Sequence, residues 1–188
     1  MFDSREFHVI PSVREIRHLD KALAGKEEWI LLSCAHIGNL RDLVVRCHQA
    51  GKKALVNYDL VGGLGSDKTA FHLMKNMFML DGVMGSSNTK LTMAKRMGMG
   101  SIRRVALEDS LAVDHVLESM KETRCNVIEL RPSYYAIQYL EYFQKKKDCM
   151  YIAGGFVDTK EMIDKAHKAG FSGVTTSCVD LWGYKPSS

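Results

Sequence analysis

Two stretches near the C-terminus place small or polar residues directly after apolar runs. CMYIAGGFVD has a Gly-Gly pair after such a run, and FSGVTTSCVD has three hydroxyl residues after another. Glycine lets backbone N–H groups approach an anion without an intervening side chain, and Thr and Ser add hydroxyl donors. The alternative is that the glycines only form a turn and the hydroxyl residues only cap a helix. Together the stretches predict a site for phosphate or a similar anion at Gly154, Gly155, Thr176 and Ser177, with Thr175 beside it.

These stretches are the last two of about eight short apolar runs that alternate with amphipathic segments. Most of the runs are apolar throughout, as expected for parallel strands buried on both faces. Alternation of this kind predicts a parallel sheet with right-handed crossovers. The predicted strands are Phe7–Ile10, Trp29–Cys34, Lys53–Asn57, Gly82–Gly85, Ile102–Ala106, Asn126–Leu130, Met150–Ala153 and Gly173–Thr176.

The eightfold repeat predicts an α/β fold, a compact TIM-like (β/α)₈ barrel of parallel strands. The chain has 188 residues, below the usual range of about 200 to over 400 for this fold, and an open doubly wound sheet is the alternative. Without a visible linker, residues 1–188 are expected to form a single domain. Barrels commonly bind phosphate in the loops after strands seven and eight, where the two stretches lie.

The first helix is predicted within SVREIRHLDKALAG. Its apolar residues Val13, Ile16, Leu19 and Leu23 recur at helical spacing, and Gly25 ends it. Helices of this kind alternate with every predicted strand and must be short in a chain of this length.

Composition and cysteine usage exclude several classes of protein. No apolar run approaches the roughly 18 residues of a membrane span, and the N-terminus lacks the apolar core of a secretory signal. The five cysteines are widely spaced, with no C-x-x-C, which favours reduced thiols in a cytoplasmic protein over a disulfide framework or a zinc site. The net charge of +4 permits an anionic partner. The seven histidines show no paired metal spacing, so no metal site is expected. Because no apolar run is long enough for a membrane span, no membrane partner is expected either.

Two acids and one arginine are predicted at the barrel mouth. Asp59 and Glu129 fall near the ends of the third and sixth predicted strands. Arg104 lies in a strand directly before the apolar run VAL, where an inward guanidinium needs a partner, either Glu129 or a phosphate, which suits its two-pronged geometry. A structural ion pair or a solvated strand-end acid is the alternative.

Basic residues offer a weak case for RNA binding. They could neutralise phosphates, although a solvated helix face explains them equally well. Tyrosines near the run Lys145–Lys147 could stack on bases, or pack in an interface between copies of the chain in a homo-oligomer. The basic residues are Lys90, Lys95, Arg96, Lys145, Lys146 and Lys147.

The sequence resembles one family over nearly its whole length. The stretches GKKALVNYDLVGGLGSDKTAFHLMK, LDGVMGSS, KRMGMGSIRRVALEDSLAVD, NVIELRPS, YIAGGFVDTKEMIDKAHKAG and GVTTSCVDLW are similar, in this order, to the glycerol-3-phosphate-responsive antiterminators. The resemblance implies a (β/α)₈-like barrel and a cytoplasmic regulator without enzymatic activity or cofactor. It also implies glycerol 3-phosphate as effector and leader mRNA of glycerol-utilisation genes as partner, bound to prevent premature termination.

The sequence departs from the family pattern around the expected ligand. Gly154, Gly155 and Ser177 match, as do Asp59, Arg104 and Glu129. Where the family has His, Lys, Leu and Gly, this chain has Asn57, Ser87, Arg131 and Ser133. The polar end of the ligand is therefore expected at Asn57, Asp59, Arg104 and Glu129. A diverged barrel that senses another metabolite, and an enzyme acting on a small phosphorylated substrate, remain as alternatives.

Overall fold

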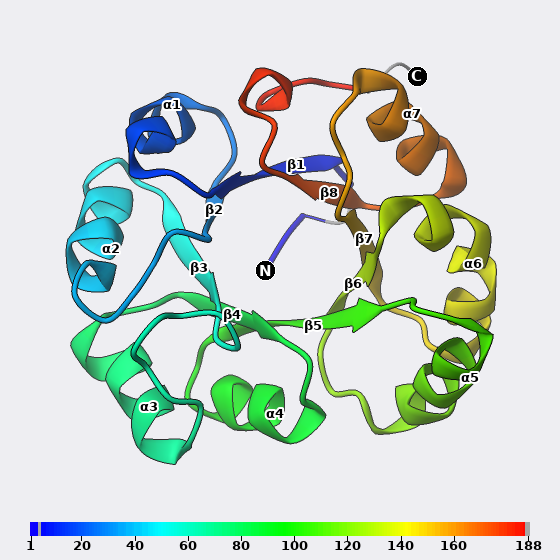
Figure 1. The fold of residues 1–188 in the computed structure, drawn as a ribbon, viewed down its shortest axis with the longest axis horizontal. Coiled ribbons are helices and arrows are strands. Elements are labelled where there is room, and N and C mark those ends of the chain that lie inside the picture. The colour runs from blue at the N-terminus through cyan, green and yellow to red at the C-terminus, as the bar shows by residue number, and fades with distance from the viewer. Residues whose placement is uncertain (4, 187–188) are drawn as a thin grey trace.

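The chain folds into a closed barrel of eight parallel strands. The computed structural model describes residues 1–3 and 5–186. The strands follow one another around the ring in sequence order, and β1 pairs with β8 to close it (Figure 1). The prediction of a (β/α)₈ barrel is confirmed.

Largely apolar and largely buried segments form the strands. Because both faces of each strand are covered, one by the barrel interior and one by helices, nearly every position is buried. The strands are β1 (His8–Val13), β2 (Trp29–Leu32), β3 (Lys53–Asn57), β4 (Gly82–Gly85), β5 (Gly100–Ala106), β6 (Val127–Arg131), β7 (Met150–Gly154) and β8 (Gly173–Thr176).

Within the described residues the chain has seven α-helices, which lie outside the strands as an outer ring (Figure 1). Several begin at a side chain that accepts a backbone N–H: Asp67, Ser87, Asp109 and Thr159 cap their helices in this way. None of the helices within the described ranges is long and apolar enough to cross a bilayer. They are α1 (Leu19–Ala24), α2 (Leu40–Gln49), α3 (Lys68–His72), α4 (Asn88–Arg96), α5 (Ser110–Ser119), α6 (Ser133–Lys146) and α7 (Lys160–Ala169), with short η1 (Ile16–His18), η2 (Leu73–Met77), η3 (Met120–Glu122) and η4 (Val179–Leu181).

The predicted start of the first helix is wrong. Ser12 and Val13 belong to β1, where they pair with Leu31 and Leu32 of β2. The buried Val13 continues the outward-facing positions of the strand, so its spacing from Leu19 is not that of one helix face. A short turn, η1, separates this strand from α1.

An apolar layer fills the barrel interior toward the amino ends of the strands. Trp29 Nε1 donates a hydrogen bond to the Met1 carbonyl (3.1 Å), and the Phe2 and Trp29 rings pack with their centroids 5.8 Å apart. Figure 1 shows the N-terminus inside the ring of strands. These contacts close the amino end of the barrel below a layer made of Ile10, Trp29, Leu31, Leu55, Met84, Ile102, Val127 and Ile152.

Candidate functional site

Polar side chains form the next layer of the barrel interior, toward the carboxyl ends of the strands. Alternate residues of a strand face the same side. A residue two positions after a member of the apolar layer therefore also points into the barrel. This places Arg104 above Ile102 and Glu129 above Val127. The inward polar residues of this layer are Ser12, Asn57, Arg104, Glu129 and Thr175.

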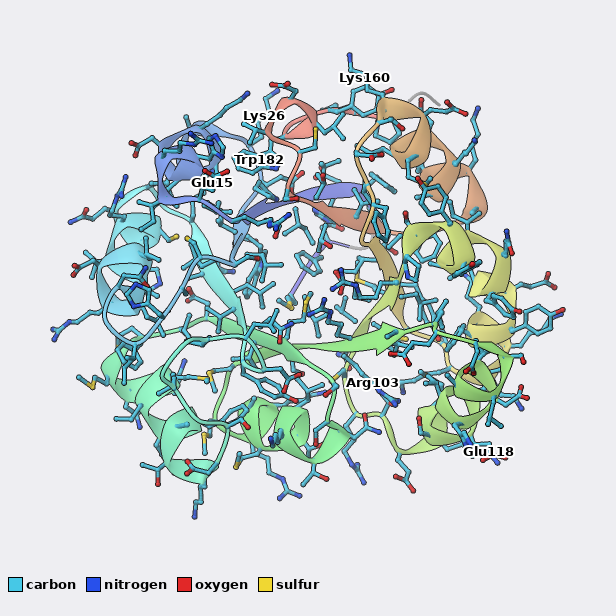
Figure 2. The ribbon with its side chains drawn as sticks, viewed as in Figure 1. Glu15, Lys26, Arg103, Glu118, Lys160 and Trp182 are labelled. Carbon is cyan, nitrogen blue, oxygen red and sulfur yellow. The ribbon has the colours of Figure 1, made fainter. Side chains whose placement is uncertain are left out.

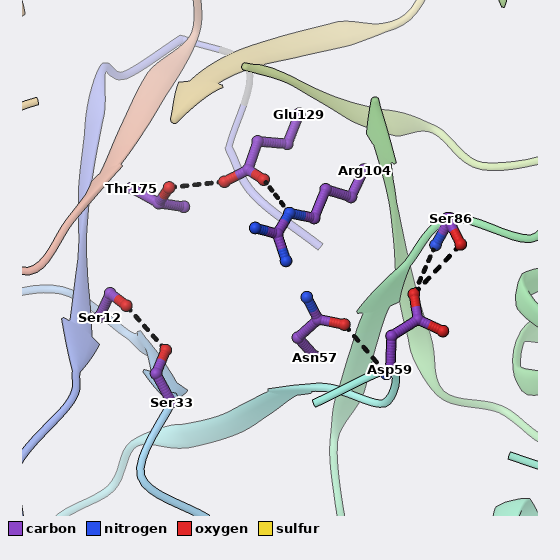
Figure 3. Close-up of polar contacts among 8 residues, drawn as sticks. All are labelled: Ser12, Ser33, Asn57, Asp59, Ser86, Arg104, Glu129 and Thr175. Atoms are coloured by element: carbon purple, nitrogen blue, oxygen red, sulfur yellow. Dashed lines mark hydrogen bonds and ion pairs between the residues drawn. The ribbon is translucent and has the colours of Figure 1, made fainter. Parts of the chain in front are cut away.

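Glu129 is the centre of this layer. The Thr175 hydroxyl donates to Glu129 Oε1 at 2.6 Å, and Arg104 Nε lies 3.6 Å from Glu129 Oε2 (Figure 3). Glu129 Oε2 is buried without a hydrogen-bond partner among the described residues. Burial raises the pKa of Glu129, while the Thr175 hydrogen bond and the Arg104 charge act in the opposite direction. Buried polar atoms are rarely unpartnered, so this oxygen is suited to a ligand hydroxyl.

The inward polar side chains line a cavity of about 800 Å³ that opens at the carboxyl end of the barrel. Glu129, Arg104 and Asn57 converge on its floor in Figure 3. Gly155 and Ser177, from the turns after β7 and β8, form part of its wall. One cavity therefore contacts both of the stretches that the sequence singled out.

Thr176 joins the two turns. Its hydroxyl donates to the Val157 carbonyl at 2.5 Å and accepts from Cys178 N at 3.0 Å. The hydroxyl is thus engaged in fixing the loop after β7 against the loop after β8. Gly155 has φ +74°, a conformation that favours glycine, and the Arg131 guanidinium lies beside it. Anion binding by Gly155 and Ser177 stays a prediction.

Gly154 has a different role from its neighbour. It does not line the cavity. A Cβ atom on Gly154 would lie 2.3 Å from Glu129 Oε1 and 2.7 Å from Thr175 Oγ1. The missing side chain makes room for the hydrogen bond between Glu129 and Thr175 across β7.

Asn57 and Asp59 occupy two different depressions. Asn57 lines the main cavity, and its Oδ1 accepts from Asp59 N at 3.1 Å. The Asp59 carboxylate accepts from the backbone N–H and the hydroxyl of Ser86, at 3.1 and 3.2 Å, and lines an adjacent depression of about 390 Å³. Arg104 lines both spaces, so Asp59 lies at the rim of the site.

Several polar residues of the cavity, Asp158 among them, were not among the predicted site residues. Ser12 and Ser33 share a hydrogen bond between their hydroxyls, 2.8 Å apart. Arg14 and Arg131 line the wall, and Arg131 Nη2 lies 3.1 Å from the position that a Cβ atom on Gly155 would take. Period-two alternation could have found Ser12, two residues after the inward Ile10, had Ser12 not been taken for a helix start.

Comparison with known proteins identifies the family. The family model of the glycerol-3-phosphate responsive antiterminators matches residues 9–182. This chain belongs to that family. The glycerol uptake operon antiterminator regulatory protein of Listeria monocytogenes strain 4b F2365 is similar in structure, with a TM-score of 0.84 and 27% identity over 94% of each chain.

Three other similar proteins share less sequence identity with this chain. A glycerol uptake operon antiterminator-related protein of Thermotoga maritima MSB8 has a TM-score of 0.81 and 24% identity, covering 95% of this chain and 99% of its own. The uncharacterized protein YgcP of Escherichia coli K12 is 24% identical over 95% of this chain and 93% of its length. The aldolase QR15, with a TM-score of 0.71 and 11% identity over 95% of this chain and 93% of its own, shares the fold alone.

The structure separates the basic residues expected to bind the RNA of an antiterminator. Lys90 Nζ donates to Ser66 Oγ at 2.5 Å and lies 5.7 Å from the centre of the Tyr58 ring. Lys145 forms an ion pair with Glu141 at 2.6 Å, and Lys146 is exposed on α6. The remaining three come together around one depression, lined among others by Lys95, Arg96 and Lys147.

Proposed function

We propose that this chain is a transcription antiterminator that binds glycerol 3-phosphate, or a similar phosphorylated metabolite, at the barrel mouth. In its ligand-bound form it would bind leader mRNA of glycerol-utilisation genes in the cytoplasm, without catalysing a reaction. The observation that carries the proposal is the unpartnered Glu129 Oε2, buried in the same cavity that the turns after β7 and β8 line.

The ligand phosphate is assigned to the wall formed by Gly155 and Ser177. The bare backbone of Gly155 allows close approach of an anion, and the Arg131 guanidinium beside it supplies a charge-assisted donor. The hydroxyl end then lies toward Glu129 and Asn57, where a carboxylate and an amide oppose two hydroxyl groups. A phosphorylated polyol of three carbons has groups of both kinds.

Ligand control of RNA binding requires two conformations with different ligand affinities. The turns after β7 and β8 are joined by the hydrogen bond from Thr176 to the Val157 carbonyl. A phosphate bound across Gly155 and Ser177 would add a second bridge between these turns. The bound ligand would thereby favour the conformation of the chain that binds RNA.

A thermal-shift screen tests the ligand. We expect glycerol 3-phosphate to raise the midpoint of unfolding more than glycerol or inorganic phosphate does, because only the phosphorylated polyol contacts both ends of the cavity. Stabilisation by no phosphorylated metabolite, at millimolar concentrations, would contradict the proposal.

A sensor of a different phosphorylated metabolite is the second candidate. Arg131, which stands where the family pattern has Leu, adds a cation beside Gly155, and Asn57 stands in place of a His. These changes favour a larger or more anionic ligand. The same screen separates the candidates, since the metabolite with the largest shift identifies the effector.

An enzyme finds less support in the geometry. Lys53, a lysine at the start of a strand, forms an ion pair with Glu28 at 2.7 Å and is half exposed at the opposite end of β3 from the cavity. It is not placed to form a Schiff base with a ligand at the mouth.

A further inference from the structure

A cationic depression of about 610 Å³ lies at the end of the barrel opposite the cavity. Lys95 and Arg96 precede β5, Arg124 precedes β6, and Lys147 precedes β7. Since all strands of the barrel are parallel, residues that precede strands gather at its amino end. We call this group the basic cluster: Lys95, Arg96, Arg124 and Lys147, with Thr92 and Thr123 between them.

The charges of the basic cluster are uncompensated within the described part of the chain. Arg96, Arg124 and Lys147 form no ion pair there, and no carboxylate lines the depression. Lys95 Nζ donates to the Arg124 carbonyl at 2.9 Å and to Asn126 Oδ1 at 3.3 Å. Four like charges around one space repel one another, so an anion that occupied it would be bound favourably.

The loop that carries Arg124 is held firmly against the barrel. Arg103, on the outer side of β5, donates to Thr123 Oγ1 and, at 2.6 Å, to Ser119 Oγ. Figure 2 shows Arg103 outside the ring of strands, between α4 and α5. Thr123 Oγ1 lies 3.2 Å from Asn88 Oδ1 at the start of α4. This network fixes the loop against the helix that ends in Lys95 and Arg96.

The shape of the depression fits an extended polyanion. Its cations come from α4, from the loop before β6 and from the end of α6, with no aromatic or apolar wall. A second depression shares Lys95 and Lys147 and continues across the amino end of the barrel, where Asn126 and Asp148 lie. A row of cations with no aromatic or apolar residue around it suits successive phosphates of a nucleic-acid backbone.

We propose that the basic cluster binds the phosphate backbone of the leader RNA. This inference rests on the proposed antiterminator function and assigns the RNA to the face opposite the effector. RNA and effector then bind at the same time without touching. The link between them runs through β5, whose adjacent residues Arg104 and Arg103 face the effector cavity and the Thr123 loop respectively.

Fluorescence anisotropy with labelled leader RNA, in the presence of glycerol 3-phosphate, tests the assignment. The test variant is Arg96→Ala/Arg124→Ala/Lys147→Ala. The control, Arg41→Ala/Lys68→Ala/Lys168→Ala, removes the same charge from exposed positions on α2, α3 and α7. We expect the test variant to bind at least about 30-fold more weakly, with a salt slope smaller by about 2, since each lost phosphate contact on a single strand lowers it by about 0.7. The control should stay within about threefold of the unchanged chain.

The outcomes separate this inference from the proposed function. Equal affinities of the test and control variants would overturn the basic cluster as the RNA surface, while RNA binding by the unchanged chain would leave the function standing. No leader-RNA binding by the unchanged chain would overturn the proposed function and the inference with it. If the triple variant fails to fold, the three single substitutions, each at a surface side chain, should still weaken RNA binding more than the single control substitutions do. An unchanged thermal shift of the test variant with glycerol 3-phosphate shows that its cavity is intact.

Discussion

Gly154 and Glu129 are so close that Gly154 can carry no side chain. The Glu129 Oε1 atom lies 2.3 Å from the position of a Gly154 Cβ atom and accepts the Thr175 hydroxyl from the far side of β7. The glycine of one strand thus lets the side chains of its two neighbouring strands meet. This contact fixes Glu129 in the centre of the cavity and leaves its other oxygen available.

We predict that Gly154→Ala weakens both the fold and the site. The added methyl group must push Glu129 and Thr175 apart, and overpacking of this kind costs about 1–3 kcal/mol. Urea unfolding measures the loss. Gly65→Ala is the matched control, because no atom lies within 4 Å of its Cβ position, and it should change the free energy of unfolding by less than about 0.5 kcal/mol. Equal effects of the two substitutions would contradict the account.

The contact between Arg104 and Glu129 should appear as a coupling energy. Arg104→Met leaves the buried carboxylate without its cation and is expected to destabilise the protein by about 1–3 kcal/mol. Glu129→Gln in the same chain removes the charge that needs the cation, so the double variant should recover at least about 0.5 kcal/mol relative to additivity. Strict additivity of the free energies of unfolding would show that the two side chains do not interact.

Arg131 should affect the ligand more than the fold. Its guanidinium lines the cavity beside Gly155 and has no ion-pair partner among the described residues. Arg131→Leu is therefore expected to leave the unfolding midpoint nearly unchanged and to weaken binding of the phosphorylated effector about tenfold or more, the effect of one hydrogen bond to a charged group. Isothermal titration measures it. Unchanged affinity would place the phosphate away from this wall.

His8 should make stability depend on pH. Its hydrogen bond to Glu27 raises the pKa of His8, burial opposes this, and the Asp3 carbonyl and the charges of Glu27 and Glu6 add to the rise. The folded state therefore binds the proton more tightly than the unfolded chain. This stabilisation is complete below the unfolded pKa of about 6.5 and is lost as the pH rises through the folded value.

Urea unfolding at a pH below and a pH above the pKa of His8 tests this contribution to stability. The unchanged chain should lose more stability between about pH 6 and about pH 9 than His8→Gln, which cannot take up the proton. Identical pH profiles for the two proteins would show that the contact with Glu27 contributes nothing.

Strands buried on both faces were the easiest elements to predict. The runs Lys53–Asn57, Gly82–Gly85 and Gly173–Thr176 agree with the structure at both ends, because burial keeps most of their residues apolar or small. The sequence predicts Ser12 and Val13 in a helix because they directly precede a helical pattern of apolar residues. Only pairing with β2 shows that they continue β1.

A site residue could be predicted where its place in a strand decides whether it faces the cavity. It could not be predicted where its role depends on contacts with side chains from distant segments. Strand ends placed Asn57 and Glu129 near the mouth, the position of Arg104 within a strand predicted that it points inward or toward the rim, and the structure brings all three to one cavity. The occupied hydroxyl of Thr176 and the contact of Gly154 with Glu129 depend on atoms from distant turns and strands. The same holds for the basic cluster, whose residues come from three separate segments that only the closed barrel brings together.

The position of a bound effector tests the central claim most directly. In crystals grown with saturating glycerol 3-phosphate, we predict density for the phosphate against Gly155 and Ser177, with a ligand hydroxyl within hydrogen-bond distance of Glu129 Oε2. A ligand bound outside this cavity, or an empty mouth at a concentration that stabilises the protein in solution, would contradict the account.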